Sequence, residues 1–411
     1  MTEFDPAALD PKDQYKLMSG TIIPRPIALV TTIGLHGTNA APFSLFQMIG
    51  VDPPMLMFSA SPRAGAIKDT VRNIEETGEF VVHIVNGSLV SVEGSVDGLS
   101  VTQEASSVAE TADRYAGDAF ALLNCALTPN VVSITVAAQA QIAQPVLVVN
   151  TTTAGASFPQ LKISLGTSSA CSIVEYVDGG ANALVVPLTE FHIADNAALQ
   201  MTTYQRLETS AWHVARSNAF LHRDSRLRQS VLSVGAHYNR SRNDAEILGT
   251  GAENELRTTF LGAGSQIHDF RTRQFHKIGR SNSTLLSKGA VADHSRSVYT
   301  GVIEIEKGAK RTDARQTNHN LLLSPHAHAD SVPNLDIREN DVVCAHASSV
   351  GPLDELQRWY LESRGVSRHD AERLMIQGFF YEMLATLPSG LADVVEEDLA
   401  QVLADVAVVT P

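Results

Sequence analysis

The sequence predicts a mainly β protein whose largest region is a stacked, strand-built solenoid. Between about residues 130 and 350, short strand-like runs such as VVSITV, LKISLGT and CSIVEYV follow one another, and Gly, Asn, Asp or Ser interrupts them at short intervals. No apolar stripe with a 3.6-residue period occurs in this region. A sandwich rarely needs so many strands, whereas each turn of a β-solenoid buries its inward side chains by stacking on the next turn. Because no strict repeat is visible, a sandwich remains the alternative.

Composition excludes several classes of function. The chain has 411 residues, 44% of them hydrophobic and 18% charged, with a net charge of −14. This charge argues against nucleic-acid or anionic-membrane partners, which need clustered Lys and Arg. No apolar run reaches the roughly 18 residues that span a bilayer, and the acidic start lacks a secretory signal. The three cysteines, Cys125, Cys171 and Cys344, form no CxxC pair, so we expect a reducing, cytoplasmic compartment.

The composition and the predicted secondary structure divide the chain into four regions. Residues 1–87 alternate strand-like runs with one predicted helix, IKDTVRNIEETG, and residues 88–129 read as a linker with a short helical segment. Residues 130–350 form the strand-rich region, and residues 351–411 are helical. In the last region Ser367 can cap RHDAERLMIQGFFYEML, with Asp370 in a capping-box position. One face of that helix carries Leu374, Met375, Phe379, Met383 and Leu384, and a final helix carries an apolar stripe from Leu391 to Val406.

Five motifs in order resemble the SufB/SufD family of scaffold subunits in SUF iron–sulfur cluster assembly, and specifically its SufD branch. They are QIHDFRT, SKGAVADHSRSVYTG, TDARQTNHNLLLS, HADSVPNLDIRENDVVCAHASSVGPLDE and YLESRGVSRHDAERLMIQGFF, within residues 88–411. The resemblance implies a right-handed parallel β-helix with C-terminal helices, acting as a non-catalytic scaffold. It also implies pairing with a SufB-like subunit and with a SufC-like ATPase that grips the C-terminal helices. The residues expected to contact the ATPase are Leu374, Met375, Phe379, Phe380 and Met383.

Cys344 and His346 are the candidate cluster residues. Side chains at i and i+2 on a strand share one face, and thiolate and imidazole are both competent iron ligands. One such pair cannot complete a four-ligand site, so the missing ligands would come across a subunit interface. The resemblance implies that His346 is the metal ligand at the SufB–SufD interface, where a transient iron–sulfur cluster is held. For Cys344 the alternative is a small buried hydrophobe.

Other histidines have weaker claims to function. His326 and His328 could share a strand face, but a polar ladder on the solenoid wall is favoured over a metal site. His268 beside Asp269 could be an oriented imidazole for acid–base work, although the resemblance favours a structural polar cluster.

The first 85 residues resemble a different family, the flavin reductase-like FMN-binding split barrels. IPRPIALVTT, NAAPFS, DPPMLMFS and KDTVRNI carry this resemblance, which ends near Val85, about halfway through such a barrel. The first residues of the predicted helix would offer free N–H groups to a phosphate. This implies an alternative function, an FMN-dependent oxidoreductase with an appended β-helix; a gene-fusion remnant is the other interpretation. The FMN-contacting residues would be Thr31, Thr32, Asn39, Ser44, Lys68, Asp69 and Thr70.

Overall fold

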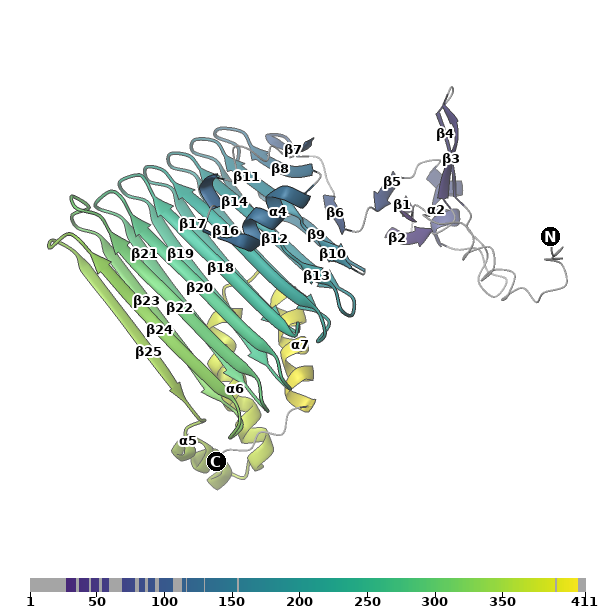
Figure 1. Ribbon diagram of the computed structural model, residues 1–411. Helices are drawn as coiled ribbons and strands as arrows, with labels where there is room; N and C mark the ends of the chain where they lie inside the picture. Colours follow the sequence, from purple (N-terminus) through teal and green to yellow (C-terminus); the bar gives the residue numbers. More distant parts are fainter. Residues whose placement is uncertain are drawn as a thin grey trace. The chain divides into compact units, whose positions relative to one another are not determined.

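The computed structural model describes residues 27–34, 37–43, 46–51, 54–58, 69–77, 81–85, 88–92, 96–105, 113–115, 117–128, 130–153, 155–388 and 390–405 (Figure 1). The chain divides into two compact units, Met1–Leu89 and Val90–Pro411.

The first unit contains a small antiparallel sheet and a hairpin. Strand β1 (Ile27–Gly34) lies between β2 (Gly37–Phe43) and β5 (Val81–Val85), and β3 (Phe46–Val51) pairs with β4 (Pro54–Phe58). Helix α2 (Asp69–Thr77) contacts β1 and begins within the segment where a helix is predicted. These elements make up a partial α/β segment, as the sequence predicts.

The second unit is a parallel β-solenoid of about eight turns, built from two long sheets (Figure 1). The prediction of a β-helix is therefore confirmed, and the sandwich alternative is wrong. Sheet I contains, in spatial order, β24 (His328–Ile337), β22 (Arg296–Ile305), β20 (Ile267–His276), β18 (Tyr238–Ile247), β16 (Trp212–Leu221), β14 (Leu188–Ile193), β11 (Gln160–Leu165), β8 (Asn130–Val136) and β7 (Leu99–Ala105), with the short β10 (Ala156–Ser157) and β13 (Leu184–Val185) beside it. Sheet II contains β25 (Val343–Gly351), β23 (Asp313–Leu322), β21 (Asn282–Val291), β19 (Glu253–Gly262), β17 (Arg226–Val234), β15 (Ala198–Leu207), β12 (Ala170–Gly179), β9 (Val146–Thr152) and β6 (Ser88–Val92).

One corner of the solenoid repeats its backbone conformation from turn to turn. Ser168, Asn196 and Asp224 follow at 28-residue intervals (196 − 168 and 224 − 196) and have φ values of 60°, 56° and 54°. This left-handed conformation is unfavourable for most residues, and Asn and Asp tolerate it best. The backbone N–H of Ser168 donates to the carbonyl of Asp195, and that of Asn196 to the carbonyl of Arg223, which joins each corner to the next. The solenoid therefore repeats in corner geometry rather than in sequence.

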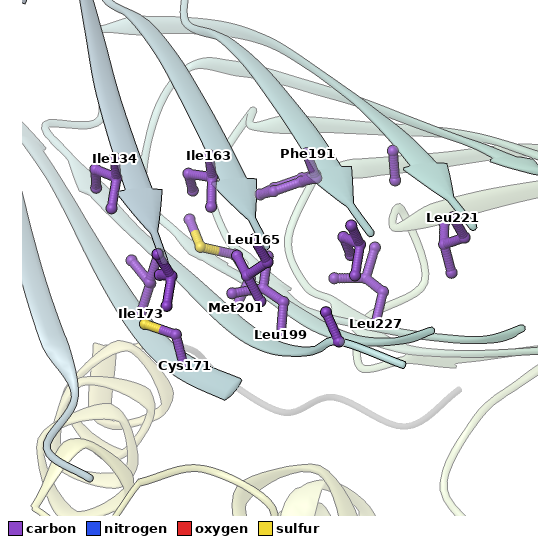
Figure 2. Packing of buried hydrophobic residues seen from close by; sticks show 14 of the residues in the cluster. Ile134, Ile163, Leu165, Cys171, Ile173, Phe191, Leu199, Met201, Leu221 and Leu227 are labelled. Atoms are coloured by element: carbon purple, nitrogen blue, oxygen red, sulfur yellow. The ribbon is translucent and has the colours of Figure 1, made fainter. Parts of the chain in front are cut away.

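The interior changes character along the solenoid axis. In the early turns, aliphatic and aromatic side chains from both sheets interlock, among them Ile134, Ile163, Ile173, Phe191 and Met201 (Figure 2). Full burial of each such side chain stabilises the fold by roughly 1.5–3 kcal/mol. In the later turns Ser, Thr, Asn, Gln and His occupy many inward positions, and they hydrogen-bond across and between turns.

A helix covers part of the outer face of sheet I near the start of the solenoid. The Asp118 carboxylate caps α4 (Ala119–Leu127) by accepting from the N–H groups of Phe120 and Ala121. The same carboxylate pairs with Arg216 of β16, at 3.0 Å. Asn124 donates to the carbonyls of Pro159 and Val186, so α4 is fixed to the sheet by its cap and by its middle.

The C-terminal helices cover the outer face of sheet II (Figure 1). Ser367 caps α6 (Arg368–Leu384) by accepting from the N–H of Asp370, and its hydroxyl donates to the Asp370 carboxylate, so the predicted cap is present. Ile376 and Phe380 of α6 pack with Leu399 of α7 (Leu391–Asp405) against sheet residues such as Leu261. Helix α5 (Glu355–Ser363), which follows β25, has no buried residue. Among the residues that the structure describes, no helix is long and apolar enough to cross a membrane.

Candidate functional site

The two ends of the solenoid differ. At the first end, β7 pairs antiparallel with β8, and β7 and β6 each have one neighbouring strand among those described. At the other end, β24 and β25 each pair with only one strand among the described elements, so both are edge strands (Figure 1). Leu335 and Ile337, whose partners in β22 are the fully buried Ile303 and Ile305, are each 39% exposed because no further turn covers them. An uncovered pair of edge strands with exposed apolar side chains is typical of an interaction surface.

Cys344 and His346 lie on this last strand, on its inward face. The register pairs Cys344 with Ala314 and His346 with Gln316, both of which are buried inside the preceding turn. His346 is exposed, because β25 is the end of the stack. An accessible imidazole can ligate a metal ion that another chain also holds.

The environment of Cys344 is less open. Its side chain is half-buried and packs against the small apolar cluster that contains Ala314, its partner in β23. Burial, with a smaller contribution from Asp313, raises the pKa of the Cys344 thiol above its ordinary value. The thiol therefore stays protonated near neutral pH, and it becomes a good ligand only when a metal ion displaces the proton.

A polar layer lies directly beneath His346. Gln316, Asn318 and Asn320 point inward from β23 and are buried, and the Gln316 amide has no hydrogen-bond partner for either polar atom among the described residues. Asn318 donates to Ser331 of β24 at 2.8 Å. Gly301 makes room for this layer, because a Cβ there would lie 2.5 Å from the Gln316 amide nitrogen. The alternation in RQTNHN marks these residues as one face of a strand, and this signal could have identified Gln316 and Asn320.

Within the residues that the structure describes, no group of three or more His, Cys, Asp or Glu side chains could hold a metal ion. His326 does not share a strand with His328, because it lies in the short connection between β23 and β24. Its ring stacks on that of His294, with ring centroids 4.8 Å apart. His328 is paired with Asp330 at 3.0 Å. His268 is buried, whereas Asp269 points to the outer face and binds Arg271, so these two neighbours do not act together.

A second candidate surface is a groove of about 530 Å³ between α6 and α7. Leu374 and Tyr381 line it and are 49% and 71% exposed. Of the residues expected to contact an ATPase, Met375 and Phe379 are partly buried against the helix core. Phe380 and Met383 are buried at 1% and 3% exposure, so they hold α6 on the sheet and offer no direct contact surface. Tyr381 was not among the predicted residues, because its position on the outer side of α6 depends on which face the sheet covers.

The predicted flavin residues are only partly described. Thr32 lies opposite Asn39 in the β1–β2 pair, and Thr31 lies opposite Ala40. Asp69 begins α2, and Thr70 is buried at 1% exposure. Ser44 and Lys68 lie outside the described residues.

Comparison with known families gives two matches. A family model described as SUF system FeS cluster assembly, SufBD core domain, matches residues 147–379. A second model, flavin reductase like domain, matches residues 18–206. The two matches overlap between residues 147 and 206, where the structure has stacked parallel strands of the solenoid.

Three curated relatives illustrate the similarity. The iron–sulfur cluster assembly protein SufD of Bacillus subtilis is 33% identical over 217 residues, which are 53% of this chain and 47% of that protein. A SufBD-family protein of Mycobacterium tuberculosis is 30% identical over 286 residues, which are 67% of this chain and 70% of the relative. The uncharacterized protein YwrF of Bacillus subtilis is 50% identical over 88 residues, which are 21% of this chain and 43% of that protein.

The chain thus spans about half the length of the SufD proteins it matches, and 70% of the mycobacterial relative. The family model covers most of the solenoid and reaches into α6. The chain belongs to the SufBD family of SUF-system iron–sulfur cluster assembly proteins, with a flavin reductase-like segment at its N-terminus.

Proposed function

We propose that this chain is a SufD-type scaffold subunit that pairs with a SufB-like subunit at the open end of the solenoid and with a SufC-like ATPase at its C-terminal helices. The observation that carries the proposal is the position of His346, exposed on an edge strand that has a neighbour on one side only. The proposed site of action is the cytoplasm.

The open end suits a partner of the same construction. Edge strands present unpaired N–H and C=O groups, and strand addition from another chain satisfies them. The exposed apolar side chains there, Val343, Val350, Leu335 and Ile337, would be buried by such a partner. Each partly exposed side chain covered in this way contributes to association in proportion to the apolar area removed from water.

The chemistry of the pair also calls for a second chain. His346 and Cys344 supply two ligands at most, and an iron–sulfur cluster needs about four. We propose that the SufB-like subunit supplies the others, so that the nascent cluster, the product of assembly, is held at the interface. His346 would be the ligand already exposed, and Cys344 would join after losing its proton to the buffer.

The helix groove is the proposed contact for the ATPase. Leu374 and Tyr381 offer exposed apolar surface, while the buried Phe380 and Met383 keep α6 rigid beneath it. Two polar contacts of one carboxylate fix α7 to sheet II. Arg206 pairs with Asp398 at 2.9 Å, and the Tyr204 hydroxyl donates to the same carboxylate.

Co-expression with SufB and SufC tests this function. The full chain is purified with its partners, and the visible absorbance of the reconstituted complex reports the cluster. With His346→Ala we expect both partners to co-purify and the cluster absorbance to fall at least several-fold. His222→Ala, at an exposed corner of the same solenoid, is the matched control and should behave as wild type. Failure of the wild-type chain to co-purify with SufB and SufC, or full cluster formation by His346→Ala, would contradict the proposal.

The flavin reductase-like match supports a second candidate function, an FMN-dependent reductase whose electrons could serve cluster assembly. Thr31, Thr32, Asn39, Ser44, Lys68, Asp69 and Thr70 would form its FMN site. This function requires yellow protein with flavin absorbance and NAD(P)H oxidation that Lys68→Ala impairs. A flavin-free preparation that stays colourless after incubation with FMN would exclude it.

A further inference from the structure

The solenoid encloses a small cavity in its early turns, away from the open end, whose lining is mainly apolar but includes buried polar side chains. Its volume is about 30 Å³, and its lining includes Glu175 and Gln205 from sheet II and Thr189, His213 and Ser217 from sheet I. A water molecule needs roughly 10–15 Å³ of such volume, so the cavity holds about two waters or one small ion.

Glu175 brings a carboxyl group into this cavity without a cationic partner among the described residues. It is 6% exposed, and its Oε2 accepts from the Thr203 hydroxyl at 3.1 Å. Burial raises the pKa of Glu175 to about 7, against the smaller effect of the Thr203 hydrogen bond. Arg216 also lines the cavity, but its guanidinium points outward and binds Asp118 and Asp244, at 3.0 and 3.1 Å. An ionised Glu175 is therefore a buried negative charge that needs compensation.

Two other polar side chains in the lining, His213 and Gln205, have unpaired polar atoms. His213 is 3% exposed, and its Nδ1 donates to Asn239 Oδ1 at 2.8 Å, because an amide oxygen can only accept. Its Nε2 therefore carries a lone pair, and that atom has no hydrogen-bond partner among the described residues. Burial lowers the pKa of His213 to about 4, so the ring is neutral near pH 7.

Gln205 adds an unpaired amide group to the same cavity. It is 1% exposed, and its amide oxygen and nitrogen both lack partners among the described residues. The Ser217 hydroxyl is already used, since it donates to Asn243 at 2.9 Å. The Gln205 amide oxygen and nitrogen are thus unpaired in a space that also holds the Glu175 carboxyl group.

We propose that this cavity binds one monovalent cation of about the size of a water molecule, held by the Glu175 carboxylate, the Gln205 amide oxygen and His213 Nε2. Potassium, sodium and ammonium share the required charge, and the nitrogen acceptor favours ammonium, which can donate a hydrogen bond to it. A divalent transition ion is disfavoured, because only two of these three groups belong to the side chains that usually bind one. The bound cation would join sheet II to sheet I across the early turns.

Thermal unfolding of the full chain in four chloride salts tests the proposal. At pH 8 and constant ionic strength, choline is replaced by 200 mM ammonium, potassium or sodium. We expect at least one of the three to raise the Tm by about 2–4 °C over choline, which corresponds to a concentration roughly tenfold above Kd. At pH 5 the effect should vanish, because Glu175 is then protonated.

Two variants and a crystal structure test whether the cation-dependent rise in Tm comes from binding in this cavity. Glu175→Gln, a neutral isostere, should lose the cation-specific shift, whereas Glu208→Gln, an exposed carboxylate after β15, should keep it. Crystals grown in rubidium chloride should show anomalous scattering within the cavity, a readout independent of any variant. Equal Tm values in all four salts, or the same cation-specific rise in folded Glu175→Gln, would overturn the proposal, as would a rubidium-free cavity combined with a shift specific to potassium.

Discussion

Gly289 shows how single inward positions fix the interior of the solenoid. It lies on β21 against the ring of Phe260, which is 1% exposed and stacks on His268 and Phe270 with centroids 5.1 Å away in each case. A Cβ at position 289 would lie 1.9 Å from Cζ of Phe260. The Phe260 ring therefore fills the space that a side chain at position 289 would occupy. Such close packing leaves no room for an added carbon atom.

Gly289→Ala should lower the free energy of unfolding by about 1–3 kcal/mol, because the Phe260 ring must leave its stacked position. Denaturant unfolding measures this change. Gly378→Ala is the matched control: it lies within α6 with nothing within 4 Å of the added carbon, and alanine there should stabilise by about 0.5–1 kcal/mol. Equal effects of the two substitutions would show that the space at Gly289 is not filled as described.

The buried histidines predict a specific loss of stability in acid. Burial lowers the pKa of His268 to about 3, below the value of about 6.5 in the unfolded chain. A group with a depressed pKa contributes stability above its unfolded pKa, and this stability is lost as the pH falls toward the folded value. His268→Gln should therefore reduce the acid sensitivity between pH 6.5 and 4 by on the order of 3 kcal/mol.

The measurement is urea unfolding of wild type and His268→Gln at several pH values, with exposed His222→Gln as control. The raised pKa of Glu175 acts in the opposite direction, with stability lost as the pH rises through about 7. Because both proteins contain Glu175, the difference between them isolates His268. A difference that does not vary with pH would contradict the assignment.

At the scale of elements, two kinds of interaction hold α6 on sheet II: apolar packing by residues of the helix, and hydrogen bonds donated by a lysine of the sheet. Phe380 is buried in the sheet contact, and Lys288 of β21 donates to the Phe379 carbonyl at 3.1 Å and to the Glu382 carboxylate at 2.8 Å. The amphipathic pattern predicts a helix with one apolar face, but Ile376 and Phe380, rather than Leu374, turn out to face the core. The docking surface, and not the pattern alone, selects the buried face.

Lys288→Met should loosen the C-terminal half of α6 while leaving the solenoid intact. The substitution keeps the apolar stem but removes two charge-assisted hydrogen bonds. Amide hydrogen exchange of residues near Phe379 should speed up roughly five- to tenfold. Lys277→Met removes a comparable ion pair with Glu246, at 2.7 Å, on sheet I, and should leave exchange in α6 unchanged. Unchanged exchange in Lys288→Met would mean that the apolar contacts alone hold the helix.

At the scale of the whole molecule, the solenoid has different ends: sheet I finishes in the antiparallel strand β7 at the beginning, whereas the parallel strands β24 and β25 form the last turn. A stacked repeat needs a cap at each terminus to stay monomeric, and among the described residues no strand covers the exposed apolar side chains of β24 and β25. This asymmetry is the reason that we propose a partner subunit at β24 and β25.

Val343→Lys should therefore reduce recovery of the SufB-like subunit at least tenfold in a pull-down, because a charge would have to be buried at the interface. Val343 is 54% exposed on β25. Leu147→Lys, at a position 51% exposed on β9 near the first end of the solenoid, is the matched control and should bind as wild type. Undiminished recovery with Val343→Lys, or equal loss with both variants, would place the interface elsewhere.

The strands that the sequence made hardest to recognise are those with polar interiors. β18 reads YNRSRNDAEI, and its inward residues Asn239, Ser241 and Asn243 are as buried as those of an apolar strand. They are tolerated because the same groups in adjacent turns supply hydrogen bonds, as Ser217 does for Asn243. Hydrophobic alternation cannot reveal such a strand, because the compensation comes from residues about 28 positions away.

The sequence by itself determined the fold class, the family motifs, the capped helix at Ser367 and the shared face of Cys344 and His346, since each of these depends on neighbours within a few residues. Only the tertiary structure decided that β25 ends the stack, that Phe380 is buried while Tyr381 is exposed, and that Glu175 and His213 meet in one cavity. Those outcomes depend on which turn lies above another, and stacking of parallel strands brings together residues whose separation along the chain carries no local signal.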